Sequence, residues 1–541
     1  MSVRPYLAKP HMKVAPAVNP VSFVSLAAIK GVSSAQIVGG EAAGYARAIE
    51  NGYITQTGVK PRGGKRRQAT TGTKAVHSLI TYESGTTKKL FAGSNGKIFD
   101  VTSPASPTVA PTPSVTGLAN NAIQHTNFAN ASGSYVVAVN GSDLHYIYNG
   151  TAWVQNSPAI TGVSSALFSN VAVYGSRLWF VQKDSLSAWF LPVDSIGGAA
   201  IELPLRNHFD RGGSLLYIAT WSLSGGAGLS QAIVFVTTNG QVAAFQGYDP
   251  TNASAWVKIG VYDIGAALGA NGHVNVGGEL ELMTTSGIVP ITQAINKDPA
   301  TLSLAAITRE INPEWKSYVA LYRNKPWYMV KWPEKNLLYV AASSDYTTSA
   351  GVDTVYGIPR LYVANMETGA WTNYTGWDFQ SVCYFNGKVY FGSSNGNVYE
   401  AENSGSDDGS YYVFRYMEWP SDFGAPSSTK TFSMIRTTYN YSVPFNAVAT
   451  ILTNFNTSWP SIPNVAANAS GSGSWDTGST WDTGGTWDQI SLPKTDVRWH
   501  SIGATGYKGS IVIQMTFSNT LAPDVEIAQN EVTFFKGSII T

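Results

Sequence analysis

The sequence predicts an all-β protein in which a β-propeller of about seven blades is combined with a second β domain, a platform of the sandwich or barrel-like type. Three observations lead to this prediction. One hairpin pattern is repeated between about residues 77 and 403, its copies recur at a nearly regular spacing, and long helical periodicity is almost absent.

The clearest copies of the hairpin pattern are Phe91 to Phe99, Val234 to Val242 and Tyr390 to Tyr399. Each copy is a run of aromatic and β-branched residues, a turn of the Asn-Gly type, and a second such run. These runs favour strands because their side chains pack well on a pleated surface. Asn-Gly favours a tight hairpin because both central residues of a type I′ turn need positive φ.

Looser copies fill the gaps between the clear ones and complete a periodic array. The turns of all seven copies lie near Asn95, Asn140, Asp184, Asn239, Ser286, Glu334 and Asn395. Successive turns are 44 to 61 residues apart, close to the period of roughly 40–50 residues that is typical of propeller blades. The last unit is long, so six or eight blades stay open, as does an irregular stack of hairpins or a β-solenoid.

The composition is that of a turn-rich β protein with few charges. Charged residues make up 13% of the 541-residue chain, about half of the usual ~25%, and the net charge of +1 provides no global field toward nucleic acid or membrane. No run of 18 apolar residues predicts a membrane span, and Met1 to Lys13 lacks the apolar core of a signal peptide. The single cysteine, Cys383, is expected to be a small core residue.

The pattern divides the chain into three parts: an N-terminal arm (1–76), the propeller (77–403) and a C-terminal β platform (404–541). From Tyr411 onward, long strands alternate without the blade period, and Ser510 to Phe517 is typical of a half-buried strand. We expect the N-terminal arm to add strands to the platform. The propeller would then be an insertion between the two parts of the platform.

A basic run ends the N-terminal arm and is the first candidate contact site. It consists of Lys60, Arg62, Lys65, Arg66 and Arg67, interleaved with Gly63 and Gly64. Such a run can hold phosphates, which makes these five residues candidate contacts with a nucleic acid or, through charge pairing, with a second subunit. A solvated loop is the simpler interpretation.

A tandem Trp-Asp element in the C-terminal part is the second candidate. Trp475, Trp481 and Trp487 recur six residues apart. Large apolar side chains left in water normally mark a contact surface, whereas a tryptophan ladder packed on its own domain is the alternative. The residue pattern from Ser474 to Trp481 also matches the Asp-box motif of sialidase-like propellers. The copies of this motif overlap here and lie outside the blades, which argues against a sialidase.

No motif indicates catalysis, a metal or a cofactor. The seven histidines form no HxH or HExxH spacing, so no zinc site is predicted. No phosphate-binding GxxxxGK[ST] loop and no GxSxG nucleophile elbow is present. We therefore predict a protein that is not an enzyme, with no metal ligand among its residues.

The layout as a whole resembles the tail nozzle proteins of short-tailed bacteriophages, also called tail tubular protein B or tail hub proteins. The resemblance rests on the segment from Gly39 to Arg67, a first blade of the type Lys89 to Gly93, aromatic blades with Asn-Gly turns, and the element from Trp475 to Asp488 before a long β end. It covers most of the chain, but no short motif in it is diagnostic.

The resemblance implies a structural virion protein that closes the distal end of a short tail and forms a channel for DNA retention and ejection. It implies a homohexamer assembled in the host cytoplasm, with partners in the tail adaptor ring, tail fibre or spike proteins, the genomic DNA, and the host cell envelope at ejection. Two alternatives remain. One is a carbohydrate-binding or glycoside-hydrolase-like propeller, with the three tryptophans stacking on sugars, and the other is a tail fibre adhesin.

Overall fold

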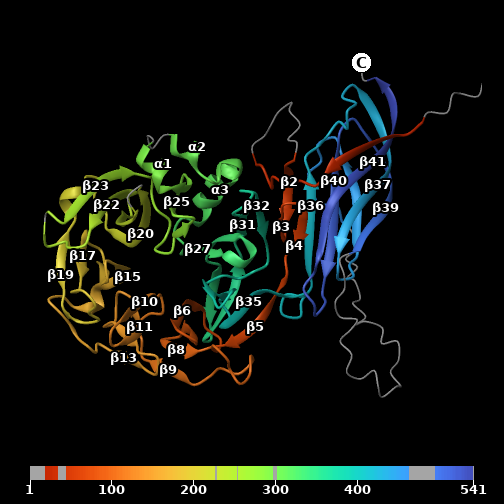
Figure 1. Ribbon diagram of the computed structural model, residues 1–541. Helices are drawn as coiled ribbons and strands as arrows, with labels where there is room; N and C mark the ends of the chain where they lie inside the picture. Colours follow the sequence, from red (N-terminus) through yellow and green to blue (C-terminus); the bar gives the residue numbers. More distant parts are fainter. Residues whose placement is uncertain are drawn as a thin grey trace, which may run out of the picture.

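The structure is a computed structural model that describes residues 19–34, 44–225, 228–252, 254–296, 301–461 and 494–539. Figure 1 shows a ring of small sheets on one side and a taller two-layered β body on the other. The fold prediction is confirmed: the chain is a β-propeller combined with a β-sandwich platform.

Seven sheets form the propeller. The first blade contains β6 (Val76–Ser84), β7 (Thr87–Ser94), β8 (Lys97–Asp100) and β9 (Pro113–Thr116). The second blade contains β10 (Gln124–Asn130), β11 (Gly133–Val139), β12 (Tyr146–Tyr148) and β13 (Trp153–Gln155). The third blade contains β15 (Phe168–Tyr174), β16 (Arg177–Gln182), β17 (Ser187–Phe190) and β19 (Ile201–Pro204). The fourth blade contains β20 (Leu215–Gly225), β21 (Gly228–Thr237), β22 (Gln241–Gly247) and β23 (Trp256–Asp263). The fifth blade contains β24 (His273–Val276), β25 (Glu279–Thr284) and β26 (Gly287–Pro290).

The sixth and seventh blades complete the ring. The sixth blade contains β27 (Trp327–Trp332), β28 (Leu337–Ala342), β31 (Leu361–Asn365) and β32 (Trp371–Tyr374). The seventh blade contains β33 (Ser381–Phe385), β34 (Lys388–Gly392), β35 (Asn397–Ser404) and β5 (Gly64–Thr70). The first strand of each blade packs against the first strand or its neighbour in the next blade, and β33 packs against β6. The ring is therefore closed around an axis lined by β6, β10, β15, β20, β24, β27 and β33.

Aromatic side chains of the repeated runs fill the spaces between blades. Between the third and fourth blades, Trp179 stacks on Trp256 with ring centroids 5.6 Å apart. Trp256 also stacks on Phe245 of its own blade, at 5.6 Å. Trp179 is fully buried together with Phe235. The aromatic runs recur once per blade because each blade must cover the face of its neighbour.

The turns match the sequence expectation in part. Both central residues have positive φ at Asn95-Gly96, as a type I′ turn requires, whereas at Asn239-Gly240 and Asn395-Gly396 the glycine alone does. The type I′ signature also appears at Asn386-Gly387, which joins β33 to β34. Asn-Gly therefore located the hairpins correctly without fixing one turn type for all of them.

The boundary drawn before residue 77 is wrong for one strand. β5 (Gly64–Thr70) belongs to the seventh blade, where it pairs antiparallel with β35 as the outermost strand. The chain thus enters the propeller by forming the outer edge of its last blade. The sequence hid this strand because it carries Lys65, Arg66 and Arg67 in place of an aromatic run.

The platform is a sandwich built from both ends of the chain, as expected for the N-terminal arm. One layer contains β2 (Ala46–Glu50), β36 (Tyr412–Glu418), β40 (Gly509–Phe517) and β38 (Ala447–Thr453). The other contains β1 (Val21–Leu26), β3 (Gly52–Ile54), β4 (Val59–Pro61), β41 (Val525–Ile539), β37 (Ser428–Tyr441) and β39 (Lys494–Gly506). Phe414 and Ile513 from the first layer pack in one core with Phe432, Ile435 and Phe534 from the second.

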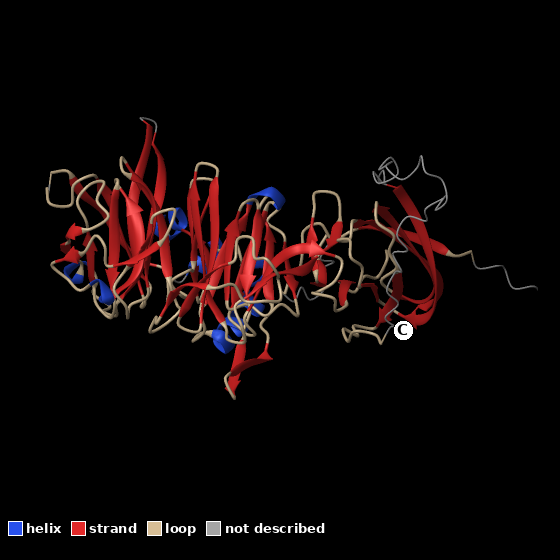
Figure 2. Ribbon diagram, turned by 90° about the horizontal axis from the view of Figure 1, so that it is seen from below, coloured by secondary structure: helices blue, strands red, loops and turns tan. Residues whose placement is uncertain are grey.

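One sheet runs without a break from the propeller into the platform. Its eight strands follow the order β27-β28-β31-β32-β2-β36-β40-β38. The link is β2, which pairs parallel with β32 at Glu50 and Asn373 and antiparallel with β36. In the view of Figure 2, the two parts accordingly form one elongated body.

Smaller elements complete the fold. β29 (Asp345–Ser349) and β30 (Val352–Gly357) form a hairpin in the sixth blade, and β14 (Ile160–Thr161) pairs with β18 (Gly198–Ala199). The helices α1 (Ile291–Asn296), α2 (Leu302–Ala305) and α3 (Asn312–Tyr322) lie between the fifth and sixth blades. Trp315 of α3 is fully buried and donates to the carbonyl of Thr284. No helix in the described ranges has the length and apolar character to cross a membrane.

The position of β5 predicts the effect of N-terminal truncation. Deleting residues 1–76 removes the outer strand of the seventh blade and leaves an edge of β35 unpaired, so we expect β33 to β35 to become sensitive to limited proteolysis. Deleting residues 1–45 retains β2 to β5 and serves as the matched control. Equal protease resistance of the seventh blade in the two truncated proteins would contradict this role of β5.

Candidate functional site

The basic run lies where the chain passes from the platform into the propeller, and most of its cations are paired within the chain. Lys60 lies 3.1 Å from Asp524 and 3.8 Å from Glu526, both in the platform. Arg66 and Arg67 pair with Glu400 and Asp408. Three of the predicted contact residues are therefore ion-paired, either with carboxylates of the platform or with carboxylates at the point where the chain leaves the propeller.

Arg62 is the centre of this junction. Its side chain is 0% exposed, and its two terminal nitrogens donate to the two carboxylate oxygens of Asp407 at 2.9 and 2.8 Å. The guanidinium also donates to Asn51 Oδ1 at 3.0 Å and to the carbonyl of Gly63 at 2.9 Å. A bidentate pair of this kind fixes orientation as well as charge.

Aromatic rings enclose the guanidinium of Arg62. Its carbon lies 4.2 Å from the centroid of Tyr412 and 4.4 Å from that of Trp377. Trp377 Nε1 in turn donates to Asp407 Oδ1 at 3.0 Å. Burial opposes the charge on both groups, yet their mutual attraction leaves the pKa of Arg62 above its ordinary value and the pKa of Asp407 below its own.

The two glycines of the run serve this packing. A Cβ on Gly63 would lie 2.6 Å from the carbonyl oxygen of Glu402, and one on Gly64 would lie 2.1 Å from that of Ser406. The outgoing and returning chains therefore touch backbone to backbone, which glycine permits. Gly63 and Gly64 have this structural reason to interrupt the basic residues.

The assignment of Arg62 as a contact for DNA or a second subunit is corrected by its burial, since it presents no surface. Lys65 lies 4.5 Å from the centroid of the Tyr399 ring, and burial lowers its pKa even though Asp407 acts in the opposite direction. Arg66 is 57% exposed despite its ion pair. Contacts of Lys60, Lys65, Arg66 and Arg67 with DNA or another subunit stay predictions.

Trp475, Trp481 and Trp487 lie outside the described residues, so their role stays a prediction as well.

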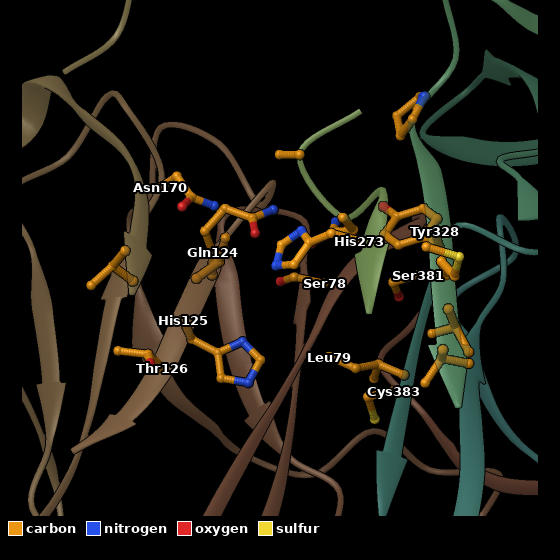
Figure 3. Close-up of a pocket in the computed structure, with 18 of the residues that line it drawn as sticks. Ser78, Leu79, Gln124, His125, Thr126, Asn170, His273, Tyr328, Ser381 and Cys383 are labelled. Atoms are coloured by element: carbon orange, nitrogen blue, oxygen red, sulfur yellow. The ribbon is translucent and has the colours of Figure 1, made fainter. Parts of the chain in front are cut away.

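A cavity of about 670 Å³ lies on the propeller axis. All seven innermost strands or the residues next to them line it, and Figure 3 shows side chains of Gln124, His125, Asn170, His273 and Tyr328 around the same space. Sequence reasoning missed this cavity. Its lining residues are separated by up to about 300 positions, and the signal that could have located them is their place at the start of each hairpin unit.

The cavity is uncharged. None of the described residues that line it is Asp, Glu, Lys or Arg. Burial lowers the pKa of both His125 and His273 to about 4, so these imidazoles are neutral at physiological pH. Burial also lowers the pKa of His77, against a weaker opposing effect of Asp353.

Several polar groups of the cavity serve the fold. Asn170 Oδ1 accepts from the backbone N–H of Ile218 at 3.2 Å, and His125 Nε2 accepts from that of Thr81 at 3.2 Å. Cys383 is a buried free thiol whose pKa is raised by burial, which fits the expected core role. The described residues contain no cluster of His, Cys, Asp and Glu suited to a metal.

A second buried charge site lies inside the platform. Glu418 accepts hydrogen bonds from Asn530 at 2.7 Å, from Tyr416 at 3.0 Å and from Ser25 at 3.4 Å, which ties β36 to β41 and β1. Burial raises its pKa to about 7, more than these bonds lower it. Unlike Asp407, this carboxylate forms no ion pair among the described residues.

Comparison with known proteins gives no family. No known protein family and no curated protein sequence matches the chain. Solved structures similar to it include the computationally designed Ika8 protein, with 9% identity, 62% of this chain and 99% of that chain covered, and a TM-score of 0.33. The Myceliophteria thermophila Cps50 (Swd1) beta-propeller domain is 13% identical, with 62% of this chain and 99% of that chain covered and a TM-score of 0.38. YCF48 bound to D1 peptide is 12% identical, with 65% of this chain and 97% of that chain covered and a TM-score of 0.36. With such low identities and scores, the propeller assignment rests on the seven sheets themselves.

The buried pair predicts a large effect of Arg62→Met. This change leaves Asp407 buried without its cation, and removing one partner of a buried ion pair costs about 3–5 kcal/mol. The matched control is Arg66→Met: Arg66 is 57% exposed and its partner Glu400 keeps a second cation, Lys388, at 2.7 Å, so we expect a loss of only about 0–1 kcal/mol. Urea unfolding of the full chain measures both, and equal losses for the two variants would contradict the special role of Arg62.

Glu418 predicts a pH dependence of platform stability. Because its folded pKa is raised, the native state keeps the proton between about pH 4.5 and 7 while the unfolded state loses it, so the free energy of unfolding falls as pH rises through this window. The full loss is about 3 kcal/mol. Glu418→Gln keeps an oxygen acceptor and should remove this part of the pH dependence, as measured by unfolding at pH 4.5 and 7.5. An unchanged difference between the two pH values would rule Glu418 out as its source.

Proposed function

We propose that this β-propeller protein is a structural virion protein, a tail nozzle that closes the distal end of a short phage tail and forms the channel for DNA retention and ejection. The observation that carries the proposal is the continuous eight-stranded sheet between propeller and platform. A component that seals a pressurised channel needs a subunit without an internal hinge. The Glu50–Asn373 pairing that joins β2 to β32 and the buried Arg62–Asp407 pair support a fixed link between the two parts.

The outer face of one platform layer supports assembly into a ring. Exposed apolar side chains of β1, β37, β39 and β41, each 36% to 70% exposed, lie on this face: Val24, Leu26, Met434, Val497, Trp499 and Phe535. The strand registers place Val24, Glu531, Arg436 and Trp499 in one row across the four strands. The Arg436–Glu531 ion pair lies between Val24 and Trp499 in this row. Because several large apolar side chains are exposed on one face, and exposed apolar surface can mark a contact, we propose that a second copy of the chain covers this face.

The low charge of the chain supports a conduit. Phosphate contacts add up along a nucleic acid and strengthen with each cation, so a channel through which DNA slides needs few unpaired cations. Four of the five residues of the basic run pair with carboxylates of the same chain. In this proposal a homohexamer joins the tail adaptor ring and tail fibre or spike proteins. It carries the DNA in the lumen between subunits and meets the host envelope at ejection.

Light scattering and negative-stain microscopy of the purified full chain, at high concentration and with tail extract added, test the proposal. The expected particle is a ring of about six copies with an axial hole. A monomer that joins no ring under either condition would overturn the nozzle assignment and leave the carbohydrate-binding and adhesin alternatives.

The platform face makes a sharper prediction. Leu26→Lys and Val497→Lys place charges on the proposed interface, and we expect either variant to shift the particle from ring to monomer without lowering its thermal unfolding midpoint. Tyr248→Lys, at a side chain 74% exposed on a propeller loop, is the matched control and should still form rings. Ring formation by both platform variants would show that subunits meet elsewhere.

A further inference from the structure

We propose that the axial cavity of the propeller binds a neutral polyhydroxylated ligand, a mono- or disaccharide in size and chemistry. This inference does not depend on the nozzle proposal, because it concerns the interior of one chain. It rests on the size of the cavity, its lack of charge, and polar groups that have no partner within the described chain.

The size of the cavity suits a small molecule. Its volume of about 670 Å³ lies within the roughly 300–1,000 Å³ of small-molecule sites. It is lined from all seven blades, so its walls are held by strand pairing rather than by loops. A ligand inside would meet a site whose shape exists before binding.

The absence of charge selects against ionic ligands. Burying an ionised group without a partner is strongly unfavourable, and the described lining residues include no Asp, Glu, Lys or Arg. A phosphate or carboxylate in this cavity would therefore find no counter-charge.

Unpartnered polar groups select for a ligand that both donates and accepts. The Oγ of Ser78 and Nδ1 of His273 have no hydrogen-bond partner among the described residues, but both atoms are closed off from the open space of the cavity. The side-chain amides of Gln124 and Asn271 also line the cavity, and they too form no hydrogen bond with the part of the chain that the structure describes. A buried polar atom without a partner costs about 1–3 kcal/mol. Ligand hydroxyls suit this mixed set because each hydroxyl donates one bond and accepts two.

Flat surfaces accompany these polar groups. Tyr328 of β27 lies beside His273 in Figure 3, and the His273 ring stacks on Tyr217 at 4.4 Å with an interplanar angle of 13°. The stacking holds the imidazole plane fixed from behind. An aromatic face beside amide and imidazole groups matches a sugar ring, which has an apolar face and polar edges.

A hairpin reaches the rim of the cavity. The hydroxyl of Tyr346 in β29 lies 3.2 Å from Nε2 of His77, which lines the cavity. Asp353 of β30 accepts from Lys74 Nζ at 3.0 Å and from the backbone N–H of Ala75 at 3.0 Å. The hairpin of the sixth blade is thus fastened to the first blade beside the site.

The test is binding of defined probes to the full chain by isothermal titration calorimetry and ligand-observed NMR. The neutral probes are glucose, N-acetylglucosamine and maltose, and the charged counterparts are glucose 6-phosphate and glucuronic acid. We expect saturable binding of at least one neutral probe and at least tenfold weaker binding of the charged ones. No saturation by any neutral probe at 20 mM, on the order of the weakest useful affinities, would show that the cavity holds water alone and would overturn the proposal.

Two cavity variants and one control locate the binding. Gln124→Met removes the amide at nearly constant size, and His273→Phe keeps the stacking on Tyr217 while removing the nitrogens. We expect each to weaken binding at least tenfold without changing the thermal unfolding midpoint. Gln293→Met on α1 is the control and should bind like the natural chain. Unchanged binding in both cavity variants would place the sugar elsewhere, and ring formation by all three keeps this result separate from the nozzle proposal.

Discussion

A single buried ion pair fastens the two crossings between platform and propeller. Arg62 lies between β4 and β5, where the chain leaves the platform, and Asp407 lies between β35 and β36, where it returns. The propeller is inserted between these two residues. Without the pair, the two ends of this long insertion would still be held by the β2 link, by β5 and by neighbouring contacts such as the Arg67–Asp408 ion pair. Tyr412 and Trp377 shield the pair from water, and shielding strengthens the attraction between the charges.

The fold then follows from two kinds of closure. Within the propeller, β5 closes the ring by completing the seventh blade with a strand from the far end of the chain. Between the domains, β2 closes the gap by joining β32 to β36 in one sheet. Both strands come from the N-terminal arm. This short segment therefore determines the closure of the ring and the rigidity of the link between propeller and platform.

Features that repeat along the chain were predictable from the sequence. Features that depend on residues far apart in the sequence meeting in the folded chain were not. The aromatic runs and Asn-Gly turns marked the hairpins because each blade repeats the same packing problem. β5 escaped because its charged residues form a strand only through pairing with β35. Arg62 was assigned to a surface because its five-residue context is basic, while the Asp407, Tyr412 and Trp377 that bury it lie more than 300 residues away. The axial cavity was invisible for the same reason, since Gln124 and His273 meet only when the ring is closed.

The position of β5 also sets an order of events during synthesis. β5 leaves the ribosome as the first strand of the propeller, yet its partner β35 begins at Asn397, 327 residues after Thr70. At about 5–20 residues per second, the nascent chain carries this strand unpaired for tens of seconds while six blades are made. The charges of Lys65, Arg66 and Arg67 suit a waiting strand, because charged edges resist pairing with other chains. Lys65, Arg66 and Arg67 thus give β5 the kind of charged edge by which natural sheets avoid pairing with other chains.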